Sequence, residues 1–136
     1  MKSGEINSLF KNLSKAIKNP KSDLKYKNKF TLLVSVVLSA QCTDVNVNNV
    51  TKNIYPKYNK PEHFVKLGQK KIEKLIKSIG LFRNKAKSVY LLSKQLIEKH
   101  NGKVPNNIED LYALPGVGRK TASVVLNEIW RNKFSI

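Results

Sequence analysis

The chain has 136 residues, which is enough for one domain with a hydrophobic core but too few for two large domains. It carries 26 Lys and Arg against 9 Asp and Glu, so its formal net charge is +17. A single cysteine, Cys42, excludes an internal disulfide and any metal or iron–sulfur site that needs several thiolates.

The excess of positive charge favours nucleic acid as the partner. Each phosphate that a Lys or Arg neutralises releases condensed cations, and the entropy of this release drives binding. A general bias towards Lys, Asn and Ile codons would give a similar composition, so charge alone leaves that alternative open. The longest apolar run, 32–38, is too short to span a bilayer, and the N-terminus lacks an apolar signal core. We therefore expect a soluble, intracellular protein without a membrane partner.

Helical spacing of apolar residues begins near the N-terminus. The segment 30–40 is apolar and rich in β-branched residues, which would also fit a buried strand. We predict a buried helix there, because no partner strand is visible elsewhere in the sequence. Another helix is predicted upstream of this segment, and it ends at Asn19-Pro20. Its apolar face consists of Ile6, Leu9, Phe10, Leu13 and Ile17.

Capping and helix-breaking residues set the bounds of the later helices. Thr43 or Asp44 is expected to cap a helix that reaches about Tyr55. The fold class predicted for the chain is all-α, with short connections throughout. The other predicted helices span 61–67, 69–79, 84–100, 108–114 and 119–130.

A tight turn, Pro115-Gly116-Val117-Gly118, separates the last two predicted helices. Its two glycines can adopt positive φ and allow a ligand to approach the backbone closely. The amides of this turn and of the next helix's first turn would then point outward, which suits a DNA phosphate. An ordinary glycine cap would give the same residues, so the turn alone is a weak signal.

Lys120 lies just after this turn, in the first turn of the predicted helix 119–130. The positive end of the helix dipole and the neighbouring Arg119 both disfavour a charged ammonium and favour a neutral, nucleophilic amine. The alternative is an exposed lysine that contacts phosphate as a point charge.

Four segments, 38–48, 79–86, 101–105 and 114–127, carry family-like patterns in one order and spacing. The last of them resembles a helix-hairpin-helix, a module that binds the DNA backbone without reading its sequence. Together the four segments resemble the endonuclease III family of DNA glycosylases. The resemblance extends over essentially the whole chain.

The resemblance implies a helical barrel of the helix-hairpin-helix glycosylase type. It would cover 22–136, with the helix-hairpin-helix at 108–130, and 1–21 would form a helix of a second domain. In the family that second domain carries a 4Fe–4S cluster, whose four cysteines are not among these residues, so we expect no cofactor here. The sequence also stops short of the family's Val-Asp-Thr-His segment, which holds a catalytic aspartate. We therefore expect a truncated member of the family.

The resemblance also implies a chemistry and a partner. The family flips a damaged pyrimidine out of duplex DNA, and a lysine amine displaces the base from the sugar. A Schiff base forms, and β-elimination then cuts the strand at the abasic site. Lys120 matches that lysine. The expected partner is double-stranded DNA with a damaged pyrimidine or an abasic site, bound by a monomer in the cytoplasm of a bacterium, at its nucleoid.

Further positions match the family's DNA contacts. Gln41 matches the residue that fills the space left by the flipped nucleotide, and Leu81 matches a hydrophobic wedge beside it. Ser39 and Asp44 match positions near the base pocket. Structural alternatives remain for these residues: Asp44 as a helix cap, Leu81 as a core or cap contact, and Ser39 bonded to its own helix backbone. The residues expected to contact DNA around the turn are Pro115, Gly116, Val117, Gly118, Arg119 and Thr121.

Two departures from the family pattern qualify these expectations. Tyr112 stands where close relatives would carry Glu, and the segment with the catalytic aspartate has no substitute by motif. We therefore expect residual lyase activity with little glycosylase activity. The alternatives are a non-catalytic DNA-binding remnant, one half of a split glycosylase, or a generic helix-hairpin-helix module in a larger complex.

Overall fold

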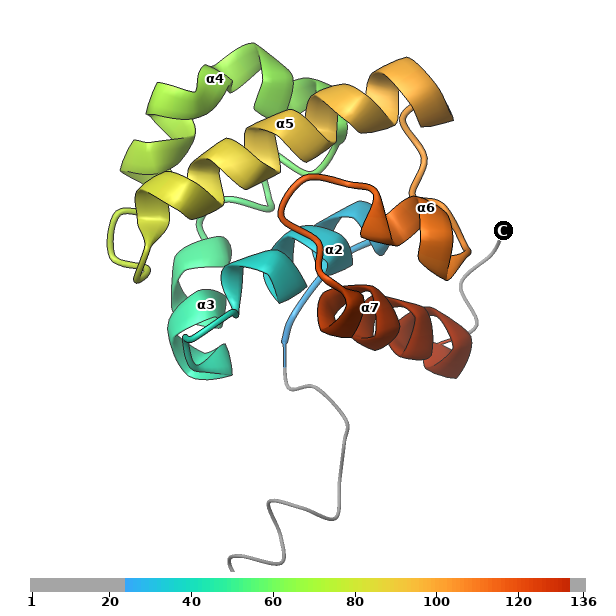
Figure 1. The fold of residues 1–136 in the computed structure, drawn as a ribbon. Coiled ribbons are helices and arrows are strands. Elements are labelled where there is room, and N and C mark those ends of the chain that lie inside the picture. Colours follow the sequence, from blue (N-terminus) through green and yellow to red (C-terminus); the bar gives the residue numbers. More distant parts are fainter. Residues whose placement is uncertain (1–23, 133–136) are drawn as a thin grey trace, which may run out of the picture.

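The computed structural model describes residues 24–132, and every regular element in that range is a helix. The all-α prediction is therefore confirmed for these residues, whereas the helix predicted over 6–17 lies outside them. None of the described helices is both long and apolar enough to cross a membrane. The helices (Figure 1) are α2 Lys29–Leu38, α3 Asp44–Thr51, α4 Pro61–Leu75, α5 Phe82–His100, α6 Ile108–Tyr112 and α7 Arg119–Asn132.

The helix α2 forms the centre of the fold. All its residues from Phe30 to Leu38 are buried, so the prediction of a buried helix is confirmed. Asn28 begins it with a capping box: its Oδ1 accepts from the Thr31 N–H at 2.8 Å, and its N–H donates to Thr31 Oγ1 at 2.9 Å. These two bonds satisfy donors that the first turn would otherwise leave open.

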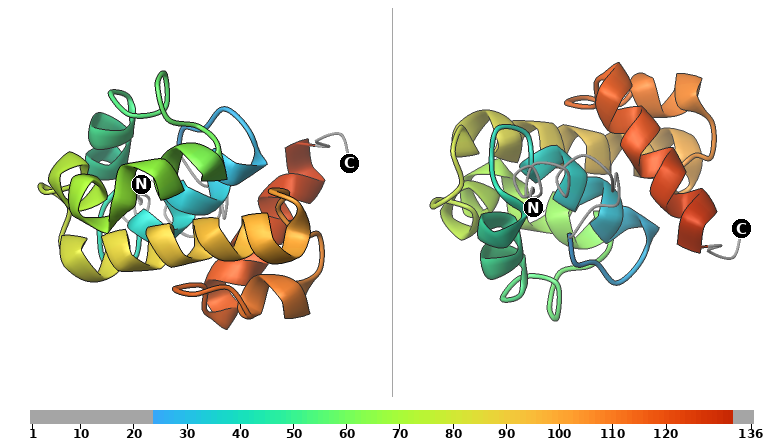
Figure 2. Two further views of the ribbon diagram at one scale, coloured as in Figure 1. Left: turned by 90° about the horizontal axis from the view of Figure 1, so that it is seen from above. Right: turned by 90° about the horizontal axis from the view of Figure 1, so that it is seen from below.

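The other helices surround α2. It contacts α3, α5 and α7, while α4 and α5 pair along their length. Figure 2 shows α3 and α7 on opposite sides of α2 in the view from below. The Phe30 and Phe64 rings meet edge to face with their centroids 5.5 Å apart, which joins α2 to α4. An apolar helix without a polar face is stable only when it is covered in this way.

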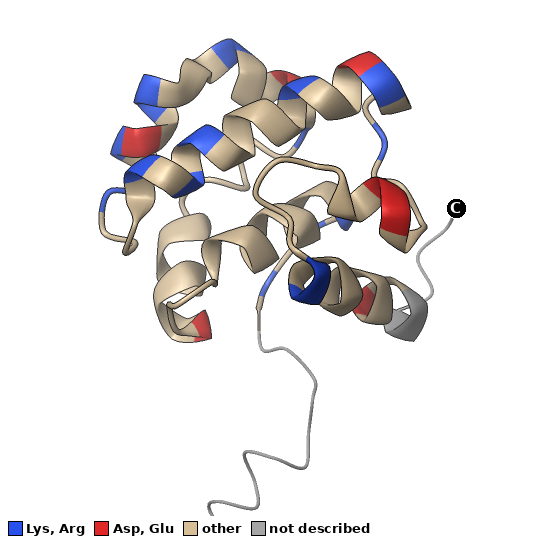
Figure 3. Ribbon diagram, viewed as in Figure 1, with Lys and Arg blue, Asp and Glu red and all other residues tan. Residues whose placement is uncertain are grey.

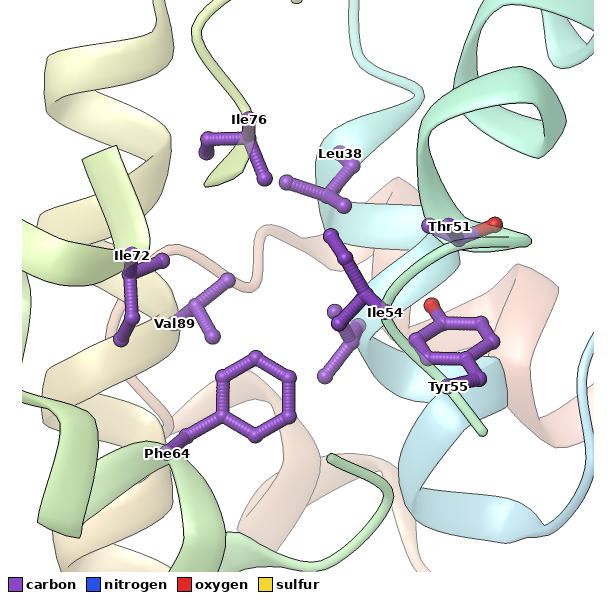
Figure 4. Close-up of a pocket in the computed structure, with 9 residues that line it drawn as sticks. Leu38, Thr51, Ile54, Tyr55, Phe64, Ile72, Ile76 and Val89 are labelled. Atoms are coloured by element: carbon purple, nitrogen blue, oxygen red, sulfur yellow. The ribbon is translucent and has the colours of Figure 1, made fainter. Parts of the chain in front are cut away.

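The core between α2, α3, α4 and α5 is closely packed. Leu38, Ile54, Phe64 and Val89 are among the side chains that converge around a small cavity (Figure 4). The cavity measures about 10 Å³, which is the space of roughly one water molecule. It cannot hold a base or a cofactor, so the function has to be sought on the surface.

The hydroxyl groups in the core are hydrogen-bonded. The Tyr55 hydroxyl donates to the Thr31 carbonyl oxygen at 3.1 Å and lies 2.5 Å from Ser35 Oγ. Burial raises the pKa of Tyr55 well above its ordinary value, so the phenol stays neutral. A buried polar group that is satisfied in this way does not destabilise the core.

Several predicted helix ends are shifted. The helix expected to reach Tyr55 ends at Thr51 and continues as turns, since the Tyr55 N–H still bonds the Thr51 carbonyl at 2.9 Å. The helices predicted over 61–67 and 69–79 meet at Gly68, whose φ of 83° breaks the helical path inside α4. The second of them ends at Leu75 rather than Ile79, because Ile76 leaves the helical region with φ −110° and ψ 22°.

The remaining bounds differ by a few residues. The buried helix covers 29–38 instead of 30–40, and the long helix begins at Phe82 instead of Asn84, with Leu81 at its N-cap. The helix predicted over 108–114 ends at Tyr112, and the last helix runs to Asn132 instead of Trp130. Helix ends depend on the packing of the flanking loops, which local sequence does not encode.

Replacing Leu92 by Ala tests the packing around α5. Leu92 is fully buried, so we expect the variant to lose about 2–5 kcal/mol of unfolding free energy through lost burial and the cavity left behind. Leu91→Ala on the same helix is the control, because Leu91 is 36% exposed and its loss should change stability by about 1 kcal/mol or less. Urea unfolding followed by circular dichroism measures both, and equal losses would contradict the assignment of the buried face.

Candidate functional site

The connection between α6 and α7 is a short hairpin with a buried base. Asn107 caps α6 by accepting from the Asp110 N–H at 2.9 Å. The Leu114 N–H donates to Leu111 O at 3.0 Å, and the Val117 N–H donates to Leu114 O at 3.1 Å. The side chains of Leu111, Leu114 and Val117 are buried, so the turn is held from below and leaves its glycines at the surface.

The two glycines of this hairpin differ from each other. Gly116 has a φ of 78°, as the sequence predicted, and a Cβ there would lie 2.5 Å from Ser88 Oγ on α5. Gly118 does not have positive φ, so that part of the prediction is wrong; it takes the N-cap position of α7, where the following turn requires no left-handed residue. A Cβ at Gly118 would meet no atom within 4 Å. Gly116 therefore serves close packing, and Gly118 leaves open space above the backbone.

Lys120 is exposed in the first turn of α7, directly after this hairpin. The Ala122 N–H donates to Gly118 O at 2.9 Å and closes the first helical turn. The amides of Arg119, Lys120 and Thr121 have no partner within the helix, and amides at a helix N-terminus can bind an anion such as phosphate. The Arg119 guanidinium lies 5.4 Å from the centre of the Tyr112 ring, a cation–π contact that directs it across α6.

The loop between α2 and α3 carries three of the predicted site residues. Ser39 ends α2, and its hydroxyl donates to the Val36 carbonyl at 2.8 Å, which is the structural alternative considered for it. Gln41 is exposed and has a φ of 58°, a left-handed conformation that non-glycine residues rarely adopt. Thr43 caps α3 through a bond from the Asn46 N–H, so Asp44 is the first helical residue and not the cap.

Leu81, between α4 and α5, is the second left-handed residue of the site. Its φ is 60°, and 56% of its surface is exposed. This exposure excludes the alternative that Leu81 is a core residue. A large apolar side chain held away from the core on a constrained backbone is suited to insertion between bases.

Lys85 and Cys42 join these two loops. Lys85 is buried, and its Nζ donates to the Ala40 carbonyl oxygen at 2.6 Å. Burial lowers the pKa of the Lys85 ammonium. Burial alone would raise the pKa of the Cys42 thiol, but hydrogen bonds from the Asn46 side chain and the Gly80 backbone, together with the Lys85 charge, lower it overall. The segments around Gln41 and Leu81 are therefore in direct contact beneath the surface.

Lys85 was missed by the sequence analysis, although a signal was available. Lys85 precedes Val89, Leu92 and Leu96 at helical spacing, so it lies on the buried face of α5. In a chain this rich in lysine, a single cation on an apolar stripe is easily taken for an exposed one. The left-handed conformations of Gln41 and Leu81 had no such signal, because neither residue type favours them.

The basic side chains of the described residues extend well beyond the hairpin. Lys and Arg follow the outer faces of α4 and α5 and mark the start of α7, while α2 and α3 carry few (Figure 3). A cleft of about 670 Å³ lies at the other end of α2 from Gln41, beside Lys27, Lys60 and Lys103. It contains none of the predicted site residues, so we do not assign the site to it.

The residues present do not fit an iron–sulfur cluster. Such a cluster needs four thiolates, and the 136 residues contain only Cys42. Among the described residues no group of three or more His, Cys, Asp or Glu side chains is placed to hold a metal ion. No step of the chemistry below is therefore assigned to a metal.

Comparison with known proteins finds a family match that includes the hairpin and Lys120. Residues 34–131 match the family model described as HhH-GPD superfamily base excision DNA repair protein. The chain belongs to this superfamily. The matched range contains every predicted site residue, from Ser39 to Thr121. In this HhH-GPD protein the hairpin, the Gln41 loop and the Leu81 loop thus lie within the part that defines the family.

Individual relatives agree with this assignment. Endonuclease III of Rickettsia conorii is 52% identical over 122 residues, which are 90% of this chain and 58% of that protein. Endonuclease III of Bacillus subtilis is 50% identical over 105 residues, 77% of this chain and 48% of that protein. A solved structure, a trapped endonuclease III–DNA covalent intermediate, matches with a TM-score of 0.78 and 46% identity, over 85% of this chain and 55% of that one. The chain thus spans only about half the length of these relatives.

The two glycines give a matched pair of substitutions. Gly116→Ala should destabilise the HhH-GPD protein by about 1–3 kcal/mol, because the new Cβ collides with Ser88 and the backbone must keep a left-handed φ. Gly118→Ala should lower the unfolding midpoint less, since its Cβ enters open space and the variant loses only the preference for glycine over alanine at the N-cap, about 1 kcal/mol or less. Thermal unfolding of both variants measures this, and a Gly118 variant as unstable as the Gly116 variant would refute the difference in their roles.

The Cys42 environment predicts faster alkylation of its thiol. A lowered pKa leaves more thiolate near neutral pH, so the pH at half-maximal iodoacetamide alkylation should lie below that of the same chain unfolded in urea. The rate is followed by mass spectrometry across a pH series. A folded midpoint equal to or above the unfolded one would show that burial outweighs the Lys85 charge and the hydrogen bonds from Asn46, Gly80 and Thr43.

Proposed function

We propose that this chain binds duplex DNA through the α6–α7 hairpin and cleaves abasic sites with the Lys120 amine. The observation that carries the proposal is the position of Lys120. It is an exposed amine in the first turn of a helix, directly after a glycine hairpin, in a chain of a base excision repair superfamily. Phosphate bound at the hairpin amides would bring a deoxyribose within reach of that amine.

The likeness to endonuclease III supports this proposal. The structure matched over 85% of this chain is a covalent complex of that enzyme with DNA. A second matched structure is a non-covalent endonuclease III–DNA complex, with the same TM-score of 0.78. The proposed partner is one DNA duplex per chain, containing an abasic site or an oxidised pyrimidine, and the proposed place of action is the bacterial nucleoid.

The proposed reaction begins with the Lys120 nitrogen lone pair. At an abasic site the amine adds to the C1′ aldehyde of the open sugar, and water leaves as a C=N bond forms. Loss of a C2′ proton then pushes electrons towards the iminium nitrogen, and the C3′–O bond breaks with the phosphate as leaving group. At a damaged base the same amine would first attack C1′ and displace the base. The electron pair of the broken C1′–N bond leaves with the base.

The two reactions make different demands on these residues. Displacing a base requires stabilisation of a developing positive charge on the sugar. By the family resemblance, the Val-Asp-Thr-His aspartate either stabilises that charge or helps to activate the lysine, and the 136 residues contain no such segment. Schiff base formation at an abasic site needs no leaving base. We therefore propose that these residues by themselves cleave abasic sites more readily than they release oxidised pyrimidines.

A second candidate function is DNA binding without chemistry. The lysines that extend along α4 and α5, away from the hairpin, favour it, because they would attract any duplex. Salt-sensitive binding is common to both candidates, so only a covalent product separates them.

Borohydride trapping on a duplex with one abasic site tests the proposal. The unsubstituted chain should form a covalent adduct, whereas Lys120→Ala and Lys120→Arg should form about a hundredfold less or none. Lys120→Arg is the sharper variant, because it keeps the positive charge and phosphate attraction but removes the amine. Lys87→Ala, an exposed lysine on α5, is the matched control and should trap normally.

The outcomes separate the candidates. A Lys120-dependent adduct supports lyase chemistry, and release of oxidised pyrimidine from duplex DNA, assayed in parallel, should be much weaker. Tight, salt-sensitive binding with no adduct would replace the proposal with DNA binding alone. An adduct that persists in Lys120→Arg would place the nucleophile elsewhere in this lysine-rich chain.

A further inference from the structure

One buried lysine contacts both of the exposed loops that flank the hairpin. Among the side chains described, Lys85 is the only buried lysine or arginine, with 5% of its surface exposed. Its Nζ donates to the Ala40 carbonyl oxygen at 2.6 Å, and its backbone N–H makes the first helical bond of α5, to the Leu81 carbonyl oxygen at 3.0 Å. Ala40 directly precedes Gln41, so the Lys85 side chain ties the Gln41 loop to the first turn of α5, whose N-cap is Leu81.

Burial of this ammonium requires an explanation other than stability. Moving a charged group out of water costs free energy, and one carbonyl bond recovers only part of it. A methionine of similar length would avoid that cost at this position of α5. What the ammonium adds is a short, directional, charge-assisted bond between α5 and the loop after α2.

The loops that Lys85 joins carry unfavourable backbone conformations. Gln41 and Leu81 have φ of 58° and 60°, a left-handed conformation that is strained for non-glycine residues. The third such residue, Asn101, ends α5, where a left-handed residue is ordinary. Strained conformations persist only where neighbouring contacts fix them. Around Gln41 those contacts are the Lys85 bond to Ala40 and the 3.0 Å bond from the Cys42 N–H to Ser39 O.

We propose that Lys85 is a positioning residue that holds Gln41 and Leu81 as one rigid pair, so that both side chains enter the DNA duplex together. The inference rests on the proposed function, since it concerns how damaged DNA is distinguished from intact DNA. A rigid pair cannot enter an intact duplex without unstacking a base pair, which is unfavourable. At an abasic site one base is already missing, so the same pair enters at lower cost. The preference for abasic DNA therefore depends on the two side chains acting together.

The test compares Lys85→Met, which removes the charged donor, with Lys85→Arg, which keeps one, and with Lys87→Met as an exposed control on α5. Each chain is titrated with an intact duplex and with a duplex carrying a tetrahydrofuran abasic analogue opposite 2-aminopurine. Lys85→Met should lower the preference for the abasic duplex about tenfold, because a tenfold change corresponds to the free energy of one charge-assisted hydrogen bond. Its affinity for the intact duplex should not change, because the hairpin amides and surface lysines remain. Lys85→Arg should recover most of the preference, and Lys87→Met should keep all of it.

The fluorescence of 2-aminopurine gives a readout that a purely structural role would not alter. Insertion beside the orphaned base changes its stacking, so the fluorescence change at saturation should shrink in Lys85→Met even when all the DNA is bound. Circular dichroism and thermal unfolding establish that each variant is folded. If Lys85→Met does not fold, the exposed residues provide the second test. The preference lost by the double variant Gln41→Ala/Leu81→Ala should then be about that of the more damaging single variant.

The possible outcomes distinguish failure of the Lys85 inference from failure of the proposed function. Full preference retained by Lys85→Met, equal loss of affinity for both duplexes, or additive losses in the Gln41 and Leu81 variants would overturn the inference and leave the proposed function standing. An unsubstituted chain that neither prefers the abasic duplex nor forms the borohydride adduct would overturn the proposed function and this inference with it.

Discussion

The complete burial of α2 is the constraint on which the rest of the structure depends. Leu32 and Leu33 expose no surface, and no side of this helix is polar, so other elements must cover it all round. The elements α3, α5 and α7 provide that cover. Because α2 is fixed on all sides, its C-terminal end at Ser39 is fixed as well, and the loop with Gln41 emerges from it at a defined place. The position of one part of the site is thus a consequence of core packing.

The same burial positions the hairpin. The helix α7 contacts α2, and its residues Ala122, Val125 and Ile129 are buried. The Tyr26 hydroxyl donates to Glu128 Oε2 at 2.9 Å, which ties the segment before α2 to α7. Lys120 lies two residues before the first of these buried side chains, on the part of α7 that projects from the core. The proposed nucleophile is carried by a rigid helix, and a group held in this way keeps its place with little loss of entropy when a substrate binds. Its exposure and its fixed position therefore have the same structural origin.

Local sequence was sufficient to predict an element where its residues, such as proline, glycine and capping side chains, directly restrict or bond the neighbouring backbone. Proline, glycine and capping residues gave the order of the helices within 24–132, although the two predicted over 61–67 and 69–79 form the single kinked helix α4. The hairpin at Gly116 follows from a residue that tolerates positive φ. The left-handed Gln41 and Leu81 could not be predicted, since neither residue type favours this conformation. Gly118 was predicted wrongly because a glycine that can adopt positive φ need not do so. The DNA-contacting roles carried over from the family remain predictions, although the structure exposes Gln41, Leu81, Arg119 and Lys120.

The distribution of charge bears on how such a protein could select its target. Lysines along α4 and α5 attract any duplex, and they do so over a wide area, so electrostatic affinity carries little information about damage. Discrimination must then come from groups whose interaction depends on the state of the bases. The exposed, conformationally constrained groups described here are an amide side chain at Gln41 and an apolar one at Leu81, both without charge. A protein with a net charge of +17 gains selectivity from such neutral groups only if they are held rigidly, because flexible ones would fold aside and leave non-specific binding in control. The strain stored at these two residues is consistent with that requirement.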